Sequence, residues 1–361
     1  MINEEQSMIV LHMDSGLGNQ MLDYAEYLAA RKSNPGQQVY IEDAYYSLPD
    51  GDAGMFAHWN GYELERVFGI KAPFIRDRIG SEAWSRVVQK VRDSEYWKGR
   101  WYDYAPITTK ALNDEGFALV NVQKNSRREV QSNEEVHHSA ARKLLSRFFT
   151  TYPGYQMKRI ARGALENSLI EKETAKYDVF QKYDGDVYGG HSLCLKFKGF
   201  GIEKIDSEIR RSFTFPEITD GKNQEVLHEI SAENAVAIHA RRSDMLFLNG
   251  YCYQYGFFRR SVRYIRRHTE NPVFYFFTDE LSRGWCEQHP EIFGLDFQND
   301  PVRFVTWNSG LNSFRDMQLM AQCHHNIFTE SSFGFWGAYL NQHEDKITCA
   351  PDPLILATNH F

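Results

Sequence analysis

The chain has 361 residues, of which 42% are hydrophobic, 25% are charged and 14% are aromatic. This composition is too apolar for a disordered chain, and the length predicts about two globular domains. Lys and Arg number 41 against 48 Asp and Glu, so the formal net charge is −7, which disfavours binding of nucleic acid or anionic lipid by the chain's overall charge.

The first residues are acidic and turn apolar only over residues 8–13, too short a run for a membrane span. We therefore expect neither a signal peptide nor an anchor. The five cysteines are odd in number, widely spaced and without a CxxC pair, which favours reduced buried thiols over disulfides or a zinc site. Together these features predict a cytoplasmic protein, with peripheral attachment to a membrane left open.

The N-terminal elements follow the order of an α/β sheet with parallel strands. A short apolar run at residues 8–11 predicts a strand, residues 14–20 a glycine-containing loop, residues 21–30 a helix and residues 39–41 a second strand. Residues 49–225 read as mixed α/β without a clear topology. Helical patterns at 139–149 and 155–170 carry many basic residues, which favours a solvated helix face over an acceptor-binding patch.

The second half repeats the alternation of strand and helix. Turn-forming residues at 218–223 mark the best boundary between domains. Beyond it we predict strands at 236–241, 273–277, 304–305 and 326–328, and helices at 256–267, 281–288, 313–323 and 333–340.

Ligands of open α/β sheets bind beyond the carboxyl ends of the strands, so the polar residues there are the candidates for a site. His239 and Arg241 share one face of a strand that ends in Arg241 and Arg242. Arginine forks suit a phosphate, although both guanidinium groups could instead pair with carboxylates.

Two further strand ends carry polar residues. Asp279 follows an apolar run and could accept hydrogen bonds from a base or a ribose, but it could equally cap the next helix. Ser331 and Ser332 lie at the start of a helix, where a phosphate is favoured and where capping by Ser332 is the simpler alternative.

The loop at residues 14–20 contains Gly16 and Gly18 but no third glycine, so it is weak evidence for a dinucleotide site, and the chain has no phosphate-binding GxxxxGK[ST] motif. The adjacent histidine pairs at 137–138 and 324–325 cannot readily chelate one ion. The residues alone predict binding of a nucleotide or nucleotide-sugar without a dedicated metal.

Four segments taken together resemble the α-1,2-fucosyltransferases of glycosyltransferase family 11, in the order that the family has them: GLGNQM with the following Asp23-Tyr24-Ala25, HARRSD, FYFFTDELSRGWC and MQLMAQCHHNIFTESSFGFWGAYLN. The last block is long and specific. The chain departs from the family pattern at Asp14-Ser15, Ser243, Glu330 and Gly334-Phe335.

The resemblance implies an α/β fold of the GT-B type, with two Rossmann-like domains facing a central cleft. We assign residues 1–225 to an acceptor-side domain, 226–345 to a domain that binds GDP-fucose and 346–361 to a C-terminal tail. The implied reaction is an inverting transfer of L-fucose from GDP-β-L-fucose to the 2-hydroxyl of a terminal galactose, without metal or cofactor. Another GDP-sugar, acceptor or linkage, and a silent binding protein, stay open as alternatives.

The resemblance also implies roles for individual residues. The first implied catalytic residue is Arg241, which would neutralise the β-phosphate. Asp244 and Asn19 follow it in order of preference. Asp244 could serve as a base or pair with an arginine. Substrate contacts are implied for His239, Arg242, Asp279, Ser331, Ser332, Phe333, Gly16, Gly18 and Gln20.

Overall fold

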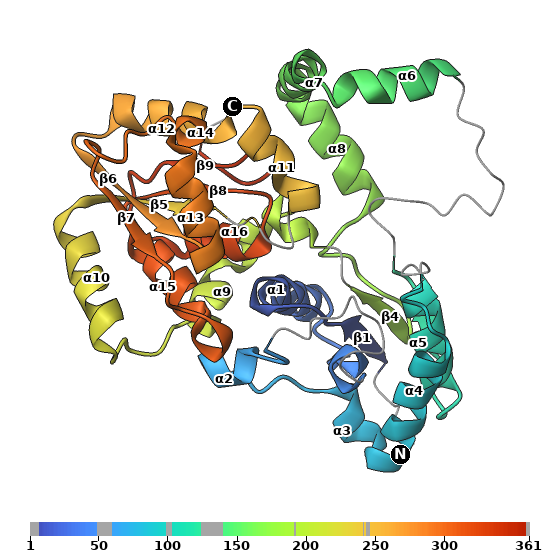
Figure 1. The fold of residues 1–361 in the computed structure, drawn as a ribbon. Helices are drawn as coiled ribbons and strands as arrows, with labels where there is room; N and C mark the ends of the chain where they lie inside the picture. The colour runs from blue at the N-terminus through green and yellow to red at the C-terminus, as the bar shows by residue number, and fades with distance from the viewer. Residues whose placement is uncertain are drawn as a thin grey trace. The chain divides into compact units, whose positions relative to one another are not determined.

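The computed structural model describes residues 7–48, 60–98, 103–123, 140–190, 193–240, 242 and 246–358. The chain divides into two compact units, residues 1–133 with 172–215, and residues 134–171 with 216–361. Each unit holds one parallel sheet with helices around it (Figure 1). The α/β class and the two parallel-sheet units predicted from the sequence are confirmed, whereas a cleft between them stays a prediction.

The sheet of the first unit has the strand order β2-β1-β4-β3. Its strands are β1 (Met8–His12), β2 (Gln38–Glu42), β3 (Val120–Asn121) and β4 (Val187–Gly190). All five residues of β1 are buried, as expected of an apolar strand between two neighbours. The helices are α1 (Leu17–Ser33), η1 (Ala44–Ser47), α2 (Leu64–Phe68), α3 (Ile75–Ile79), α4 (Ser81–Asp93), α5 (Tyr104–Asn113), η3 (Cys194–Lys196), η4 (Ile202–Ile205) and α9 (Asp206–Ser212).

The sheet of the second unit has the strand order β7-β6-β5-β8-β9. Its strands are β5 (Asn234–His239), β6 (Pro272–Phe277), β7 (Val302–Val305), β8 (His325–Phe328) and β9 (Thr348–Cys349). The helices are α6 (Ala140–Phe149), α7 (Tyr152–Ala164), α10 (Gly221–Ala232), α11 (Leu246–Gln254), α12 (Phe257–His268), α13 (Glu280–Gln288), α14 (Pro290–Phe293), η5 (Gly310–Asn312), α15 (Phe314–Gln322) and α16 (Ser332–Leu340). Helix α8 (Glu166–Lys176) crosses from this unit into the first.

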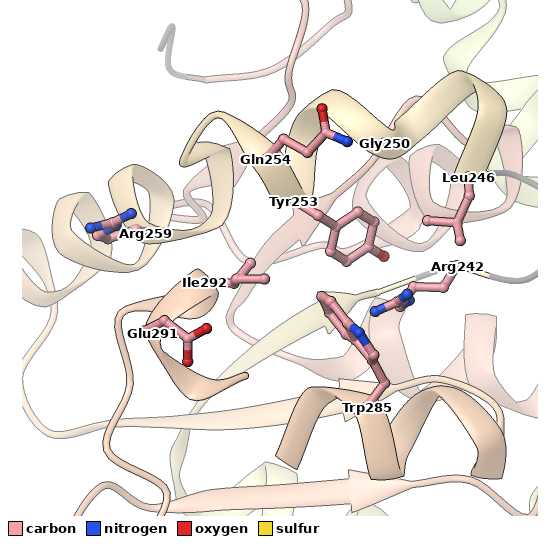
Figure 2. A pocket seen from close by; sticks show the side chains of 9 residues that line it. All are labelled: Arg242, Leu246, Gly250, Tyr253, Gln254, Arg259, Trp285, Glu291 and Ile292. Carbon is pink, nitrogen blue, oxygen red and sulfur yellow. The ribbon is translucent and has the colours of Figure 1, made fainter. Parts of the chain in front are cut away.

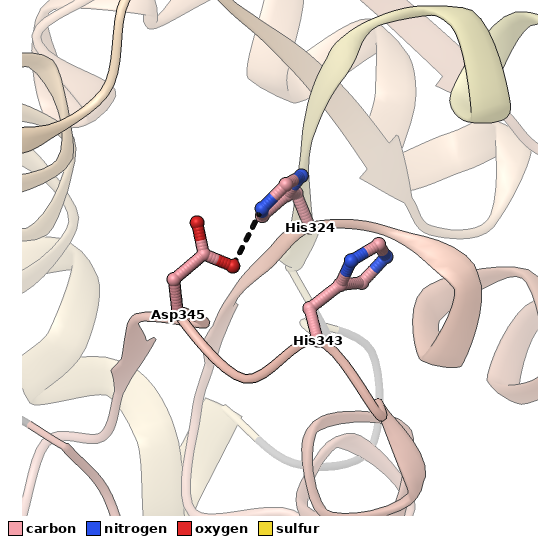
Figure 3. A group of neighbouring side chains, drawn as sticks. All are labelled: His324, His343 and Asp345. Atoms are coloured by element: carbon pink, nitrogen blue, oxygen red, sulfur yellow. Dashed lines mark hydrogen bonds and ion pairs between the residues drawn. The ribbon is translucent and has the colours of Figure 1, made fainter.

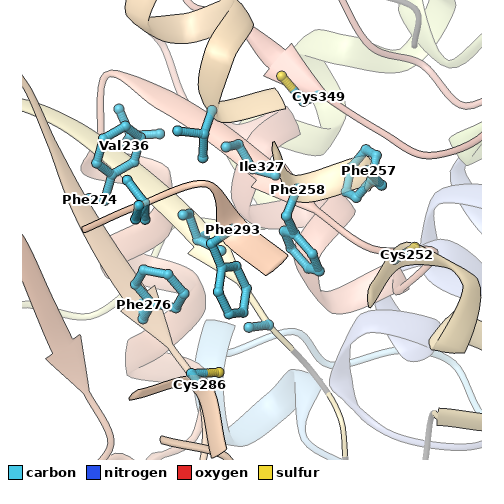
Figure 4. Packing of buried hydrophobic residues seen from close by; sticks show 14 of the residues in the cluster. Val236, Cys252, Phe257, Phe258, Phe274, Phe276, Cys286, Phe293, Ile327 and Cys349 are labelled. Atoms are coloured by element: carbon cyan, nitrogen blue, oxygen red, sulfur yellow. The ribbon is translucent and has the colours of Figure 1, made fainter. Parts of the chain in front are cut away.

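Aromatic side chains dominate the core of the second unit. Phe274 and Phe276 lie on the same face of β6 and pack in one cluster with Phe258 of α12 and Phe293 of α14 (Figure 4). The rings of Phe276 and Phe293 are 4.9 Å apart and meet edge to face. Full burial of a phenylalanine stabilises a fold by roughly 1.5–3 kcal/mol, so this cluster stabilises the second sheet and fixes the positions of its strand ends.

Several sequence-based boundaries differ from the structure. The predicted domain limit at 225/226 falls inside α10, whereas the units divide between Phe215 and Pro216. Residues 134–171 cluster with the second unit rather than with the N-terminal half. The predicted tail is not separate from the sheet, because Thr348 and Cys349 form the edge strand β9 beside β8.

The elements that were not foreseen include three with an unusual sequence pattern. Strand β4 (VYGG) ends in two glycines, β9 has two residues, and α11 (LFLNGYCYQ) is apolar without helical periodicity. All five cysteines are buried free thiols, as predicted. Among the described residues, no helix combines the length and the apolar character needed to cross a membrane.

Candidate functional site

The carboxyl ends of three strands meet at one edge of the second sheet. In the register of the sheet, His239 at the end of β5 lies beside Phe277 of β6 on one side and Phe328 of β8 on the other. The segments that follow these strands therefore start side by side. They contain the predicted residues that the resemblance assigns to the donor.

His239 packs against the first turn of α16. Its side chain is buried, with 7% exposed, and its ring lies 5.6 Å from the ring of Phe333. Gly334 makes this approach possible, because a Cβ atom at that position would lie 2.7 Å from Nδ1 of His239. The departure from the family pattern at Gly334 thus accommodates the predicted histidine.

The N-terminus of α16 carries the two predicted serines. Ser331 is the N-cap and Ser332 the first helical residue, so the expected capping by Ser332 is wrong. The Ser331 side chain is buried yet makes no capping hydrogen bond. Without such a cap, the first amides of this nine-residue helix suit an anion.

Asp279 caps α13. Its two carboxylate oxygens accept hydrogen bonds from the backbone N–H and the hydroxyl of Ser282, each at 2.8 Å. The capping alternative is therefore confirmed, and a contact with substrate stays a prediction. Beside it, the hydroxyl of Thr278 donates to the carbonyl of Ala240 at 3.2 Å and ties the ends of β6 and β5 together.

Arg242 stacks on aromatic rings instead of pairing with a carboxylate in the described part of the chain. The carbon at the centre of its guanidinium group lies 3.1 Å from the ring centre of Trp285 and 5.4 Å from that of Tyr253 (Figure 2). Burial lowers the pKa of Arg242. These three side chains line a cavity of about 510 Å³ together with Leu246, Gly250, Gln254, Arg259, Glu291 and Ile292.

Two predicted catalytic residues, Arg241 and Asp244, and the divergent Ser243 lie outside the described residues. Glu330, another departure from the family pattern, is held by α11. Its backbone N–H donates to Oδ1 of Asn249 at 3.1 Å, and its carboxylate accepts from the hydroxyl of Tyr251 at 3.4 Å.

The first unit contains a buried charged network that sequence reasoning missed. His12 ends β1, and Glu42 lies beside it in the register at the end of β2. Nδ1 of His12 is 2.9 Å from Glu42, and Nε2 is 3.2 Å from Asp14. Burial disfavours the charged ring, but the hydrogen bonds and charges of the two carboxylates outweigh it and raise the pKa of His12 to about 10.

Glu42 is fully buried, and its carboxylate accepts several hydrogen bonds. Its carboxylate accepts hydrogen bonds from the hydroxyl groups of Tyr104 at 2.9 and 3.1 Å and Tyr188 at 2.8 Å, and from the N–H of Ala44 at 2.6 Å. The signal in the sequence was an acidic residue ending one strand and a histidine ending its neighbour. Asp14, at 16% exposure, is the more accessible carboxylate of the pair that holds His12.

The predicted glycine loop is shorter than expected, because α1 begins at Leu17 with Gly16 as its N-cap. Asn19 lies in the first turn and is half-buried. Gln20 is fully buried: its amide donates to the carbonyls of Ser15 and Gly61 at 3.0 and 2.8 Å. This side chain therefore holds the loop, and the substrate contacts expected of Gly16, Gly18 and Gln20 stay predictions.

Metal-ligating side chains gather at the opposite end of β8. Nε2 of His324 lies 2.9 Å from Asp345, and the rings of His324 and His343 stack at 4.2 Å (Figure 3). The ligand atoms of these three residues lie within 4.8 Å of one another. His325 takes no part: it is buried and contacts Thr269 and the N–H of Ile347.

The comparisons with known proteins agree with the motifs. Residues 204–355 match the model of Glycosyl transferase family 11. Over 186 residues the chain is 33% identical to an alpha-1,2-colitosyltransferase of Escherichia coli, which covers 48% of this chain and 60% of that protein. Over 163 residues it is 27% identical to human galactoside alpha-(1,2)-fucosyltransferase 1, covering 40% of this chain and 43% of that one.

Among solved structures, the fucosyltransferase NodZ from Bradyrhizobium aligns with 92% of this chain and 93% of its own, at 11% identity and a TM-score of 0.42. The chain thus spans about half the length of the curated relatives, and the matched part holds every described candidate residue of the second unit. The match of residues 204–355 to the model of Glycosyl transferase family 11 confirms the resemblance predicted from the motifs.

Proposed function

We propose that this protein transfers L-fucose from GDP-β-L-fucose to the 2-hydroxyl of a terminal galactose, with inversion at the anomeric carbon. The observation that carries the proposal is the meeting of the β5, β6 and β8 ends inside the segment that matches the family. The α-1,2 linkage in the names of both relatives supports the linkage.

In this proposal the leaving diphosphate is bound at the start of α16. As the bond to fucose breaks, negative charge gathers on the β-phosphate, and preorganised donors and cations stabilise it. Ser331, Ser332 and the backbone N–H of Phe333 supply the donors. Arg241 supplies the cation. Arg242, which stacks on Trp285, adds a second positive charge next to it in the sequence.

The nucleoside is assigned to the neighbouring strand ends. His239 is buried beside α16, and Asp279 begins α13. Each carboxylate oxygen can accept more than one hydrogen bond, so Asp279 can cap its helix and still accept from a ribose hydroxyl or a guanine N–H.

The transfer step joins the galactose 2-oxygen to the anomeric carbon while the bond from that carbon to the phosphate oxygen breaks. The proton of the hydroxyl passes to a base, for which we propose Asp244, with Asn19 positioning a sugar. Asp244→Asn should lower turnover much more than GDP affinity. An equal loss in both would instead assign Asp244 to a structural ion pair with an arginine.

The direct experiment is GDP release from GDP-fucose by the purified protein, with and without lactose or N-acetyllactosamine, and with GDP-mannose as the control donor. We expect galactoside-dependent release that excess EDTA does not diminish, because the proposal uses no metal. Release independent of acceptor would mean donor hydrolysis. If the protein binds GDP but releases none from GDP-fucose, the proposed enzyme activity is wrong and the protein is a catalytically silent binding protein.

A second candidate differs only in the donor. The relative at 33% identity is a colitosyltransferase, and colitose is fucose without its 3-hydroxyl. A site that hydrogen-bonds this hydroxyl rejects the sugar that lacks it, whereas a site without such a bond discriminates weakly. Competition between GDP-fucose and GDP-colitose in the same assay, read as the ratio of kcat/KM, decides between them.

A further inference from the structure

Helices α6 and α7 form a segment whose charge opposes that of the whole chain. Residues 140–165 contain six lysines and arginines and no Asp or Glu, although the chain carries a net charge of −7. These six are Arg142, Lys143, Arg147, Lys158, Arg159 and Arg162. The segment is therefore a local cationic site on an acidic protein.

The same segment collects the exposed apolar side chains. Among the described residues, thirteen large hydrophobic side chains are exposed, and eight of them lie between residues 144 and 165. They are Leu144, Leu145, Phe148, Phe149, Tyr152, Met157, Ile160 and Leu165. Leu144 is 70% exposed and Ile160 63%, so the patch is far denser than scattered surface residues.

The pattern is that of amphipathic helices. Leu144, Leu145 and Phe148 follow the spacing of one helical face, whereas Arg147 lies outside this stripe. In α7 the exposed Met157 and Ile160 are separated by three positions. Arg147 of α6, and Lys158 and Arg162 of α7, thus lie away from these apolar stripes.

Helix α7 is fixed to its unit on another side, which leaves these residues uncovered. The ring of Tyr155 packs 5.5 Å from that of Tyr251 in α11, and Arg162 pairs with Asp352 at 2.6 Å. Helix α6 turns sharply into α7 (Figure 1): a Cβ atom on Gly154 would lie 2.1 Å from the carbonyl oxygen of Phe148. The corner holds both helices in a defined relation.

We propose that α6 and α7 dock this protein onto the surface of an anionic phospholipid bilayer. Helices with lysine and arginine on one face and leucine and phenylalanine on another insert their apolar face at the boundary of headgroups and acyl chains. Anionic headgroups attract the basic residues within a Debye length. A symmetric contact between two copies of this segment would bring its basic residues together with no acidic residue of the segment to pair with them. The charge of the segment therefore favours an anionic membrane surface over a second copy of the same segment. This inference does not depend on which sugar the enzyme transfers.

The test is co-sedimentation of the full chain with vesicles of phosphatidylcholine alone and of phosphatidylcholine with phosphatidylglycerol. We expect binding to the anionic vesicles that weakens as salt is raised from 50 to 500 mM. The double variant Leu145→Gln/Ile160→Gln should bind about tenfold more weakly or worse, because two inserted side chains become polar. Arg147→Gln/Lys158→Gln should lose the preference for anionic vesicles.

The matched control is Leu281→Gln, since Leu281 is 91% exposed but belongs to α13, outside the patch. It should bind like the wild type. Far-UV circular dichroism checks that each variant folds. Failure of the wild type to bind anionic vesicles would overturn the proposal. If light scattering then shows a dimer that the apolar variant dissociates, the patch binds a second copy of the chain instead.

Discussion

His12 keeps a positive charge inside the first unit because its two ring nitrogens contact Glu42 and Asp14. A histidine whose pKa is higher in the folded state than in the unfolded state stabilises the fold most at low pH. The pKa of His12 is raised from 6.5 to about 10. Its contribution is therefore complete below about pH 6.5, declines as pH rises from there, and is lost once the pH passes about 10.

His12→Gln should lower the free energy of unfolding by about 3 kcal/mol at pH 6, because it leaves the buried Glu42 without its cation. Urea denaturation of wild type and variant from pH 6 to 10 measures this. The gap between the two should narrow as the pH rises, and the comparison cancels other groups near the network, such as Tyr104 and Tyr188. A gap that stays constant over this range would mean that His12 is neutral in the folded protein.

Arg241→Ala should reduce transfer by about a thousandfold or more, because the leaving phosphate loses its cation. The far-UV circular dichroism spectrum should stay unchanged. Arg263→Ala, on the exposed side of α12, is the matched control and should keep normal turnover. Near-normal activity of the Arg241 variant would remove this residue from the mechanism.

At the scale of elements, α16 depends on a glycine for its approach to β5. Gly334→Ala would place a Cβ atom 2.7 Å from His239 and 2.8 Å from Cβ of Phe328. We expect a loss of about 1–3 kcal/mol in the free energy of unfolding and weaker GDP binding, because His239 or the start of α16 must move.

The control for this variant is Gly284→Ala in α13, where nothing lies within 4 Å of the added atom. Alanine is the better helix former, so this change should raise stability by about 0.5–1 kcal/mol. Thermal unfolding and calorimetric titration with GDP compare the two. Equal behaviour of both variants would show that the contact with His239 is relaxed in solution.

Most strands of the second sheet could be predicted from the sequence, because short apolar runs rich in aromatic residues, such as VFYFF, favour a buried parallel strand. Strand β4 and helix α11 were not predicted, because their glycine and aromatic residues do not follow the apolar periodicity of a strand or a helix. The residues at the strand ends were found by their polarity after an apolar run. Their local roles, such as the cap made by Asp279, depend on the helix that follows, and both alternatives had been left open.

The network of His12, Glu42 and Asp14 was missed for a similar reason. Residues 12 and 42 are thirty positions apart, and only the parallel register of β1 and β2 brings them together. Pairing of distant strand ends is a property of the sheet, and a short apolar run alone does not specify its neighbour. The motifs nevertheless identified the family, because they rest on residue types at fixed spacings along the chain and do not require the strand pairing to be known.

At the scale of the whole molecule, the proposed GDP site belongs to the second unit alone. At a free concentration of about 100 times its dissociation constant, GDP should raise the free energy of unfolding of the state that it binds by about 2.7 kcal/mol. Hydrogen exchange should then slow in the peptides that contain the end of β5 and the start of α16, and not in those that contain the ends of β1 and β2. Slowed exchange around Gly16 with GDP alone would place part of the nucleotide on the first unit.

The buried thiols have a practical consequence. Cys194 is the one cysteine of the first unit, whereas Cys252, Cys286, Cys323 and Cys349 belong to the second. Because all five are buried, an alkylating reagent reaches them only when their unit opens. Pulse labelling followed by intact-mass measurement therefore counts the opening events: a single adduct records the first unit, four adducts the second and five the whole chain. The native protein carries its own reporters for the order in which its halves unfold.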